Sequence, residues 1–167
     1  MHLGLDDSFG MKKRNGKPLD HENIVSVMTD WWDGRDLSPA VLKVFFIHFK
    51  NTTFIAEIGN QLVGFLIGFM SQCEEGVGYI HFAGVHPQFR QVGIGRQLYE
   101  KFYYACKTNH RSIVKSCTSP INKLSILFHQ RMGFEIEPGD GIVDDVSVTL
   151  DYLGKGISLA PSFILAS

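Results

Sequence analysis

The stretch from residue 77 to residue 98 constrains the fold most, because an apolar segment leads through a glycine-containing loop into an amphipathic segment. Residues 77–86 are almost all apolar or aromatic, which predicts a strand in the middle of a sheet, and Pro87 ends it. A helix is predicted from 95 to 107, with one apolar face made by Ile94, Leu98, Phe102 and Ala105. The chain therefore places the end of a central strand just before the N-terminus of a helix.

The loop before this helix is suited to binding an anion. The first N–H groups of a helix have no intrahelical acceptor, and the helix dipole adds partial positive charge there. Gly93 and Gly95 carry no side chain that would keep an anion away from the main chain. The loop therefore predicts a phosphate or pyrophosphate site.

Several kinds of site share this physics. A P-loop needs Gly-Lys followed by Ser or Thr, whereas this chain has Gly95-Arg96-Gln97. A dinucleotide-binding fingerprint needs a third glycine where Leu98 stands, and an acidic residue at the end of the next strand, which ends in Cys117-Thr118. A plain strand-to-helix turn explains most isolated Gly-x-Gly sequences. The surrounding sequence is therefore needed to distinguish an anion-binding loop from such a turn.

The surrounding sequence resembles the GNAT N-acetyltransferase superfamily. Arg90-Gln91-Val92-Gly93-Ile94-Gly95 matches its loop, (Gln or Arg)-x-x-Gly-x-(Gly or Ala), and Val85-His86-Pro87 matches the preceding hydrophobic-x-Pro. The segment from Asn122 to Gly133-Phe134 is similar to the family helix that begins with Asn and ends in Gly-Phe. The likeness covers about residues 24–150, and residues 31–35 and 133–140 also look like a small bacterial subgroup.

The resemblance implies a GNAT fold of the α/β class, with a central mixed, mostly antiparallel twisted sheet flanked by helices, as a single domain over residues 1–167. It also implies acetyl-CoA as co-substrate, with its pyrophosphate on the loop amides and its pantetheine arm along the strand before the loop. The Val85 amide is then an oxyanion donor near the thioester. The cofactor-binding residues implied in this way are Val85, Arg90, Gln91, Val92, Gly93, Ile94, Gly95, Arg96, Asn122 and Phe128.

The reaction that the resemblance implies is direct acetyl transfer to a primary amine, which needs a base because an alkylamine is mostly protonated at neutral pH. Family members often place Glu or His on the strand equivalent to 77–86. Strict alternation puts Tyr79, His81 and Val85 on one face of that strand. We expect His81 to be the base and Tyr79 to position a water or the substrate, with Glu57 in reserve. The alternative for His81 is a structural core histidine.

The general acid is where the chain departs from the family. Phe128 stands six residues after the asparagine, where many members carry tyrosine, and a phenyl ring cannot donate a proton. His129 lies about 100° further round the helix and is expected to face solvent. The CoA thiolate then leaves unassisted, or a water or Tyr79 protonates it. Cys117 faces the expected cleft, but direct transfer is the family expectation rather than a covalent acyl-enzyme.

The rest of the chain predicts further helices and strands of one mixed α/β structure. Apolar spacing indicates a helix after Asp20, a second helix opening at Ser38-Pro39, and a third over 122–132 that ends at a left-handed Gly133. Besides 77–86, strands are predicted over 53–58, 61–70, 112–118, 143–150 and 157–165, with a weak one near 9–14.

Composition excludes several function classes. A net charge of −1 over 167 residues lacks the basic surface of a general nucleic-acid binder, and the dispersed charges argue against a membrane-surface protein. Three isolated cysteines and no paired histidines at ligand spacing predict reduced thiols and no metal site. The start lacks the pattern of a signal peptide and no apolar stretch is long enough to cross a bilayer, so we expect a cytoplasmic protein.

The acceptor is the least constrained part. The near-neutral charge slightly favours a small amine or amino acid over a protein tail. The alternatives are acetylation of a protein or peptide amine, an acyl-CoA-binding regulatory module without turnover, and a structural domain with a coincidental loop. Residues 151–156 depart from a stretch common in the subgroup, and the apolar segment 158–166 is a candidate for pairing across a homodimer.

Overall fold

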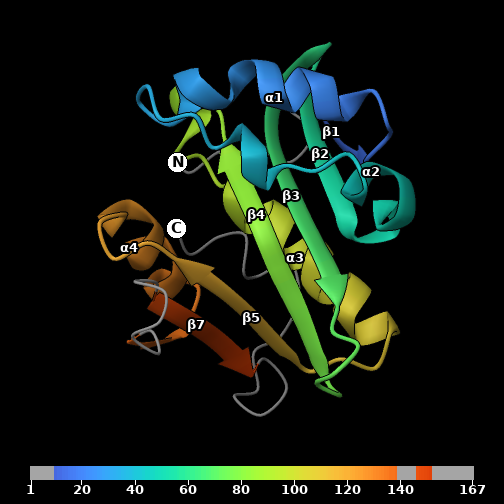
Figure 1. Ribbon diagram of the computed structural model, residues 1–167, viewed down its shortest axis with the longest axis vertical. Helices are drawn as coiled ribbons and strands as arrows, with labels where there is room; N and C mark the ends of the chain where they lie inside the picture. Colours follow the sequence, from blue (N-terminus) through green and yellow to red (C-terminus); the bar gives the residue numbers. More distant parts are fainter. Residues whose placement is uncertain (1–9, 139–145, 152–167) are drawn as a thin grey trace.

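The computed structural model describes residues 10–138 and 146–151, and within these ranges seven strands form one open sheet (Figure 1). Their order across the sheet is β1-β2-β3-β4-β5-β7-β6. Neighbouring strands are antiparallel except for β4 and β5, which run parallel. The strands are β1 (Met11–Asn15), β2 (Thr53–Ile58), β3 (Gln61–Met70), β4 (Val77–Val85), β5 (Ile113–Thr118), β6 (Glu135–Glu137) and β7 (Val146–Asp151).

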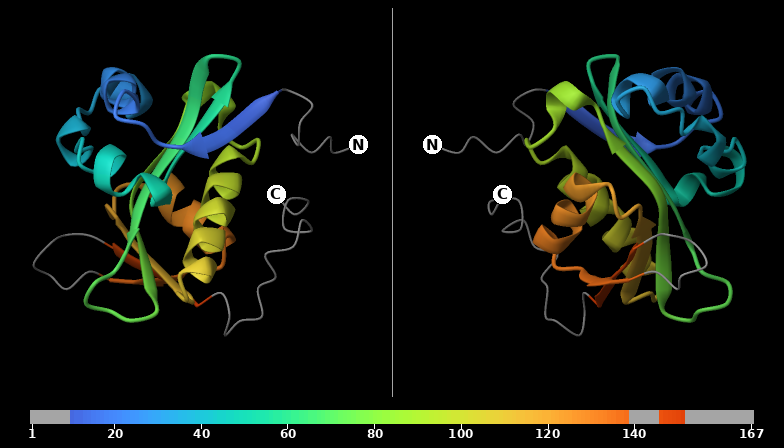
Figure 2. Two further views of the ribbon diagram at one scale, coloured as in Figure 1. Left: turned by 90° about the vertical axis from the view of Figure 1, so that its right-hand side faces the viewer. Right: turned by 60° about the vertical axis from the view of Figure 1, so that its left-hand side comes forward.

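Helices lie on both faces of this sheet (Figure 2). The long helix α3 (Ile94–Thr108) lies along one face, and α4 (Lys123–Arg131) packs beside it through Phe128 and Tyr99. The opposite face carries α1 (Asp20–Trp31) and the short α2 (Phe45–His48). Three 3-10 turns complete the described elements, at Ser38–Ala40, Lys50–Thr52 and Pro87–Phe89.

The core consists of two apolar clusters, one on each face of the sheet. On the α3 face, Leu66 packs with Leu98 and Phe102, whereas on the α1 face Phe65 packs with Ile24 and its cluster. Side chains of a strand alternate between faces, so neighbouring residues of β3 enter different clusters. A strand covered on both faces is apolar along its length, which explains the continuous apolar patterns of β3 and β4.

Most elements predicted from the sequence are confirmed. The mixed, mostly antiparallel sheet flanked by helices is present, and β2, β3 and α3 cover the predicted segments closely. The weak first strand is also real, as β1. Gly133 ends α4 with a φ of 90°, as expected for a left-handed C-terminal glycine.

The predicted helix opening at Ser38-Pro39 is wrong. The chain makes a 3-10 turn over Ser38–Ala40, leaves it at Val41 with φ −100° and ψ 90°, and forms only the four-residue α2 further on. The carbonyl groups of Ala40 and Val41 accept hydrogen bonds from histidine side chains, which is a tertiary contact that a helical periodicity does not reveal.

Two other differences concern the C-terminal part. The three-residue β6, with the sequence Glu-Ile-Glu, carries too short a pattern to predict, and it forms because β7 offers it a partner. The predicted strand 143–150 corresponds to β7, but the predicted strand 157–165 lies outside the described residues. In the part of the chain that the structure describes, no helix has the length and apolar character needed to span a membrane.

Candidate active site

The parallel strands β4 and β5 separate after three residue pairs. Val77, Gly78 and Tyr79 pair with the start of β5, and no later residue of β4 pairs with a described residue of β5. At the point of separation the Ser116 hydroxyl donates to the Ile80 carbonyl at 2.8 Å. Beyond it a wedge opens between the two strands, toward the end of β4 where α3 begins, as the diverging arrows of Figure 1 illustrate.

A β-bulge at His81 changes the faces of β4. Ile67 of β3 lies opposite Phe82, while the next residue, Gly68, lies opposite Ile80, so His81 is the extra residue. Before the bulge, Tyr79 and His81 contact rings of the α1-face cluster. After it, Val85 packs on the α3 face. The expectation that Tyr79 and His81 share a face with Val85 is therefore wrong, because it assumed an uninterrupted period of two.

The same bulge decides which backbone amides face the wedge. The His86 N–H donates to Val63 of β3 at 2.9 Å, so alternation directs the N–H groups of Val85 and Ala83 away from β3 and into the wedge. Val85 is among the cofactor-binding residues expected from the sequence, whereas Ala83 is not. Counting back in steps of two from Val85 would have found it. Ala83 lies about 6–7 Å nearer to His81 along the strand than Val85 does.

The loop after β4 turns the start of α3 toward the mouth of the wedge. Gln91 has a φ of 64° and Gly93 a φ of 92°, both in the left-handed region, and Gly93 is the N-cap of α3. Its carbonyl accepts from the Gln97 N–H at 3.0 Å, so the preceding amides of the first turn have no acceptor within the helix. No acidic side chain lies in that turn. An anion placed there meets main-chain donors and no opposing charge.

The side chain of Arg90, the first residue of the predicted loop, donates to two carbonyl groups. Arg90 donates from Nε to the Val85 carbonyl at 3.1 Å and from Nη2 to the Trp31 carbonyl at 2.6 Å. Arg96 is 8% exposed. The Arg90 side chain therefore ties the loop to α1 and β4.

Helix α4 flanks the same loop. Asn122 caps it, with Oδ1 accepting from the Ser125 N–H at 3.2 Å. Phe128 lies against the start of α3, so close that a β-carbon on Gly95 would come within 3.3 Å of its ring. The structure thus brings Phe128 to the loop, next to Val85, while Asn122 lies at the N-terminus of the same helix.

His129 is buried, so the expectation that it faces solvent is wrong. It is 4% exposed, because its step round the helix turns it onto Tyr99 and Phe134 of the packed core. Nδ1 lies 2.7 Å from the Ser125 carbonyl, which can only accept, so Nδ1 carries the hydrogen and Nε2 accepts from the Tyr99 hydroxyl at 2.9 Å. Burial lowers the pKa of His129, against a raising effect of the Ser125 carbonyl.

The predicted base lies where the wedge begins. His81 Nε2 lies 2.8 Å from the Ala40 carbonyl, and its ring stacks on Phe45 with centroids 4.8 Å apart. Across the wedge, the Tyr79 hydroxyl lies 3.1 Å from Cys117 Sγ on β5. Tyr79, His81 and Cys117 therefore gather at the vertex, while the loop lies at the open end.

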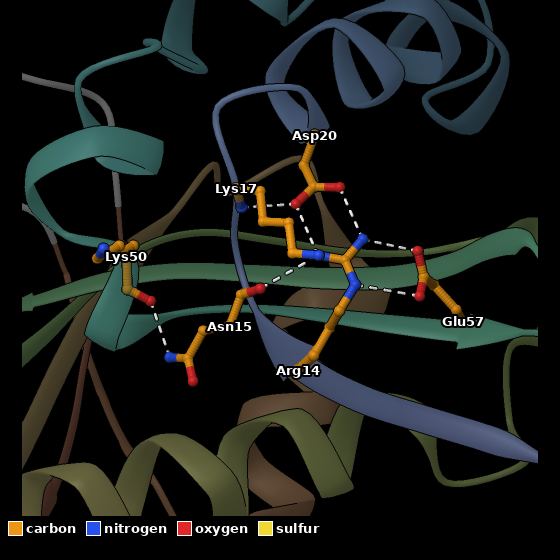
Figure 3. A network of polar contacts seen from close by, with 6 residues as sticks. All are labelled: Arg14, Asn15, Lys17, Asp20, Lys50 and Glu57. Carbon is orange, nitrogen blue, oxygen red and sulfur yellow. Dashed lines mark hydrogen bonds and ion pairs between the residues drawn. The ribbon is translucent and has the colours of Figure 1, made fainter.

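Glu57, the reserve base, belongs to a different group of contacts (Figure 3). Arg14 lies between Glu57 and Asp20, at 2.7 and 2.8 Å. The hydrogen bonds to Asp20 and then to Glu57 raise the pKa of Arg14, whereas the pKa of Asp20 is lowered by its Arg14 and Lys17 hydrogen bonds in spite of burial. With Arg14 as its partner and two strands away from β4, Glu57 is poorly placed to take a proton at the wedge.

A cavity of about 260 Å³ lies beside this network, away from the wedge, and is lined by Asp20, Asn23, Ser26, Val27, Glu57, Asn60 and Leu62. Its two carboxylates are already paired with Arg14. Over residues 10–138 and 146–151, no group of three or more His, Cys, Asp or Glu side chains is arranged to hold a metal ion.

Comparison with known proteins identifies related sequences. The family model of the acetyltransferase (GNAT) family matches residues 22–134. An uncharacterized N-acetyltransferase from Methanocaldococcus jannaschii is 36% identical over 86 residues, or 49% of this chain. The match spans only 38% of the length of that relative.

Solved structures share the fold at low sequence identity. Diaminobutyrate acetyltransferase EctA from Paenibacillus lautus, in complex with its substrate L-2,4-diaminobutyric acid and coenzyme A, matches with a TM-score of 0.71 and 18% identity, over 86% of this chain and 96% of that one. Arabidopsis thaliana Naa50, in complex with the bisubstrate analogue CoA-Ac-MVNAL, matches with a TM-score of 0.67 and 19% identity, over 84% and 97% of the two chains. At these identities the likeness concerns the fold.

Proposed function

Because the chain belongs to the GNAT family of acetyltransferases, we propose that it transfers the acetyl group of acetyl-CoA directly to a primary amine. The observation that carries this proposal is the wedge between β4 and β5, which leads from His81 to the amides at the start of α3. An acyl-CoA needs both ends of such a site, one for the thioester and one for the pyrophosphate.

The residues present fit acetyl-CoA. The pyrophosphate would meet the main chain from Gln91 to Arg96, where Gly93 has open space around it and no acidic side chain opposes the charge. The pantetheine arm would run along the free edge of β4, where the amides of Ala83 and Val85 face the wedge. Asn122 and Phe128 of α4 would line its other side.

Catalysis would begin with removal of a proton from the amine. His81 donates through Nε2 to Ala40, so in the neutral ring the lone pair is on Nδ1, which would take the proton directly or through a water held by Tyr79. The neutral amine then attacks the thioester carbonyl, and the oxyanion would accept a hydrogen bond from Ala83 N–H or Val85 N–H.

The attack forms the carbon–nitrogen bond and turns the carbonyl oxygen into an oxyanion. Collapse of this tetrahedral intermediate restores the carbonyl and breaks the carbon–sulfur bond, and the extra proton on the nitrogen passes to water or to the departing sulfur. The expelled group is the CoA thiolate. With Phe128 where many members have tyrosine, the thiolate leaves unassisted, or a water or Tyr79 supplies its proton. Phe128 would then serve as packing for the cofactor and for the start of α3.

The acceptor we favour is a small amine or amino acid, with a protein or peptide amine as the alternative. Similar folds occur in proteins crystallised with either kind of acceptor, since EctA holds diaminobutyric acid and Naa50 a peptide analogue. We also propose a single domain over residues 1–167, a cytoplasmic location and a place in the small bacterial subgroup, although the curated relative is archaeal. A homodimer through segment 158–166 concerns residues outside the described ranges.

The first experiment is a thermal-shift titration with acetyl-CoA, CoA and NAD. At about 100 times Kd, binding at one site adds about 2.7 kcal/mol to stability, which for a domain of this size raises Tm by about 5–10 °C. A shift with acetyl-CoA and none with NAD supports the cofactor assignment, and no shift with acetyl-CoA contradicts it. A screen of primary amines by thiol release then separates an enzyme from a module that binds acyl-CoA without turnover.

A further inference from the structure

Two histidines from different elements donate hydrogen bonds to neighbouring carbonyl groups of one turn. His21 Nε2, on α1, lies 2.9 Å from the Val41 carbonyl oxygen. His81 Nε2, on β4, lies 2.8 Å from the Ala40 carbonyl oxygen. Since a carbonyl oxygen only accepts, each Nε2 carries its hydrogen. In each neutral ring, the lone pair is therefore on Nδ1.

The carbonyls are available because the chain leaves helical geometry at Val41. The N–H groups of Ala40 and Val41 donate to Leu37 and Ser38 at 3.0 and 2.9 Å, which closes the 3-10 turn. Val41 then adopts φ −100° and ψ 90°, and its side chain is 1% exposed within the α1-face cluster. In a helix that continued through this point, both carbonyl groups would accept hydrogen bonds from helical N–H groups. The burial of Val41 and the two hydrogen bonds from His21 and His81 therefore favour the same non-helical conformation.

Two adjacent phenylalanines of α2 hold the two rings. Phe46 meets His21 edge-on at a centroid distance of 5.9 Å, and Phe45 stacks on His81 at 4.8 Å. Each imidazole is thus held by one of two consecutive carbonyl groups of the turn and by one of two consecutive phenylalanines of α2. Movement of the turn at Val41 would therefore also move the acceptor of His81.

We propose that His21 is a positioning residue for acetyl transfer. By holding the Val41 carbonyl, it keeps the Ala40 carbonyl directed at His81 Nε2, so that Nδ1 of His81 stays the nitrogen that takes the proton. This inference depends on the proposed function, in which His81 is the base. When Nδ1 is protonated, the bond from Nε2 to Ala40 becomes charge-assisted and stronger, so the turn also stabilises the imidazolium.

Other ionisable groups around the turn do not replace this arrangement. Glu22 of α1 pairs with Lys43 at 3.9 Å, and both are exposed. Asp36 accepts from the Ser38 N–H, and the Tyr79 hydroxyl contacts Cys117. His48 of α2 is exposed. Among the described residues, no carboxylate forms an ion pair with His21 or His81, so the carbonyls orient these rings.

The first test is ¹⁵N NMR of the full chain labelled in histidine, which reports the tautomer of each ring. In the wild type, His21 and His81 should both give the pattern of a ring protonated at Nε2, assigned by comparison with H21Q and H81A. In H21F, His81 should lose its single tautomer, whereas H21Q retains an N–H donor and should keep it. A wild-type His81 protonated at Nδ1 would overturn the proposal without relying on any variant being folded.

The second test is kinetics with acetyl-CoA and the primary amine that gives the fastest thiol release. H21F should lower kcat about tenfold, which is less than the rate acceleration that a general base supplies. The pH profile of kcat should shift, while KM for acetyl-CoA stays unchanged. H21Q should recover most of the rate. In an H81A background, H21F should cost nothing further, because its effect acts through His81.

The outcomes distinguish the role of His81 from the role of His21. If H81A leaves the rate and pH profile unaltered, His81 is not the base and the role of His21 fails with it. If H81A lowers the rate but H21F does not, or if the two losses multiply in the double variant, the base stands and His21 has no positioning role.

Discussion

Arg90 Nη2 lies 2.6 Å from the carbonyl oxygen of Trp31. Trp31 is the last residue of α1, so a cation meets the negative end of a helix dipole. The Nε of the same side chain binds the Val85 carbonyl at the end of β4. One guanidinium therefore joins α1, β4 and the loop that leads into α3.

Replacing Arg90 should reveal this bracing role. Arg90→Ala is expected to lower the free energy of unfolding by about 1–3 kcal/mol, because two hydrogen bonds from a charged donor are lost. Arg90→Lys should recover only part of this lost stability, because a lysine ammonium cannot donate to both carbonyl groups in the geometry of a planar guanidinium. The readouts are urea unfolding and calorimetry with CoA. Unchanged stability together with CoA binding weakened tenfold or more would instead make the guanidinium a cofactor ligand.

Gly93→Asp should abolish CoA binding. The substitution places a carboxylate beside the main-chain donors of the first turn of α3, where the pyrophosphate is proposed to lie. Gly59→Asp is a matched control, because Gly59 also has a positive φ and open space around it, but lies in the turn between β2 and β3. Both variants should lose up to about 1–2 kcal/mol of stability from the left-handed backbone. Equal CoA affinity of the two variants, by calorimetry, would exclude the pyrophosphate assignment.

The Ser116 hydroxyl should matter for the wedge. Ser116→Ala removes the donor to the Ile80 carbonyl at the point where β4 and β5 part, in a buried position. We expect about 1–2 kcal/mol of lost stability by denaturant unfolding, the cost of a buried hydrogen bond. Ser26→Ala, whose hydroxyl makes an exposed local bond to Asn23, should cost much less. Similar losses in the two variants would mean that Ser116 does not hold the strands together.

The elements that could be predicted from the sequence are those with a local signal. Local sequence is enough to predict three features that the structure contains. They are the apolar strand β4, the glycine-containing turn before α3 and the left-handed glycine after α4. The family loop and the helix after Asn122 carry the cofactor prediction, and the cofactor-binding residues stay predictions. These signals depend on residues close in the chain, so no tertiary contact had to be known.

The missed features depend on contacts between distant residues. The bulge at His81 exists only relative to the register of β3, so period-two reasoning placed Tyr79 and Val85 on one face. The helix expected after Ser38 is replaced by a turn whose carbonyls bind His21 and His81. The catalytic assignments of His81 and Tyr79 stay predictions.

The buried His129 should make stability depend on pH near neutrality. Burial lowers the pKa of His129 in the folded chain below its ordinary value of 6.5, so below about that pH the unfolded chain takes up a proton that the folded chain refuses. The free energy of unfolding should therefore fall as pH drops through 6.5 toward the lower folded pKa. The lowered pKa of Asp20 acts below its ordinary 3.8, outside this window.

The measurement is urea unfolding of the wild type and His129→Gln at intervals from pH 7.5 to 5.5. Glutamine cannot be protonated in this range, so the variant should lose this part of the slope while being less stable at pH 7.5, where the Tyr99 hydroxyl has a poorer acceptor. The difference between the two curves isolates His129 from the other histidines. Parallel curves would show that His129 is protonated equally in the folded and unfolded chain, and the lowered pKa would then not hold.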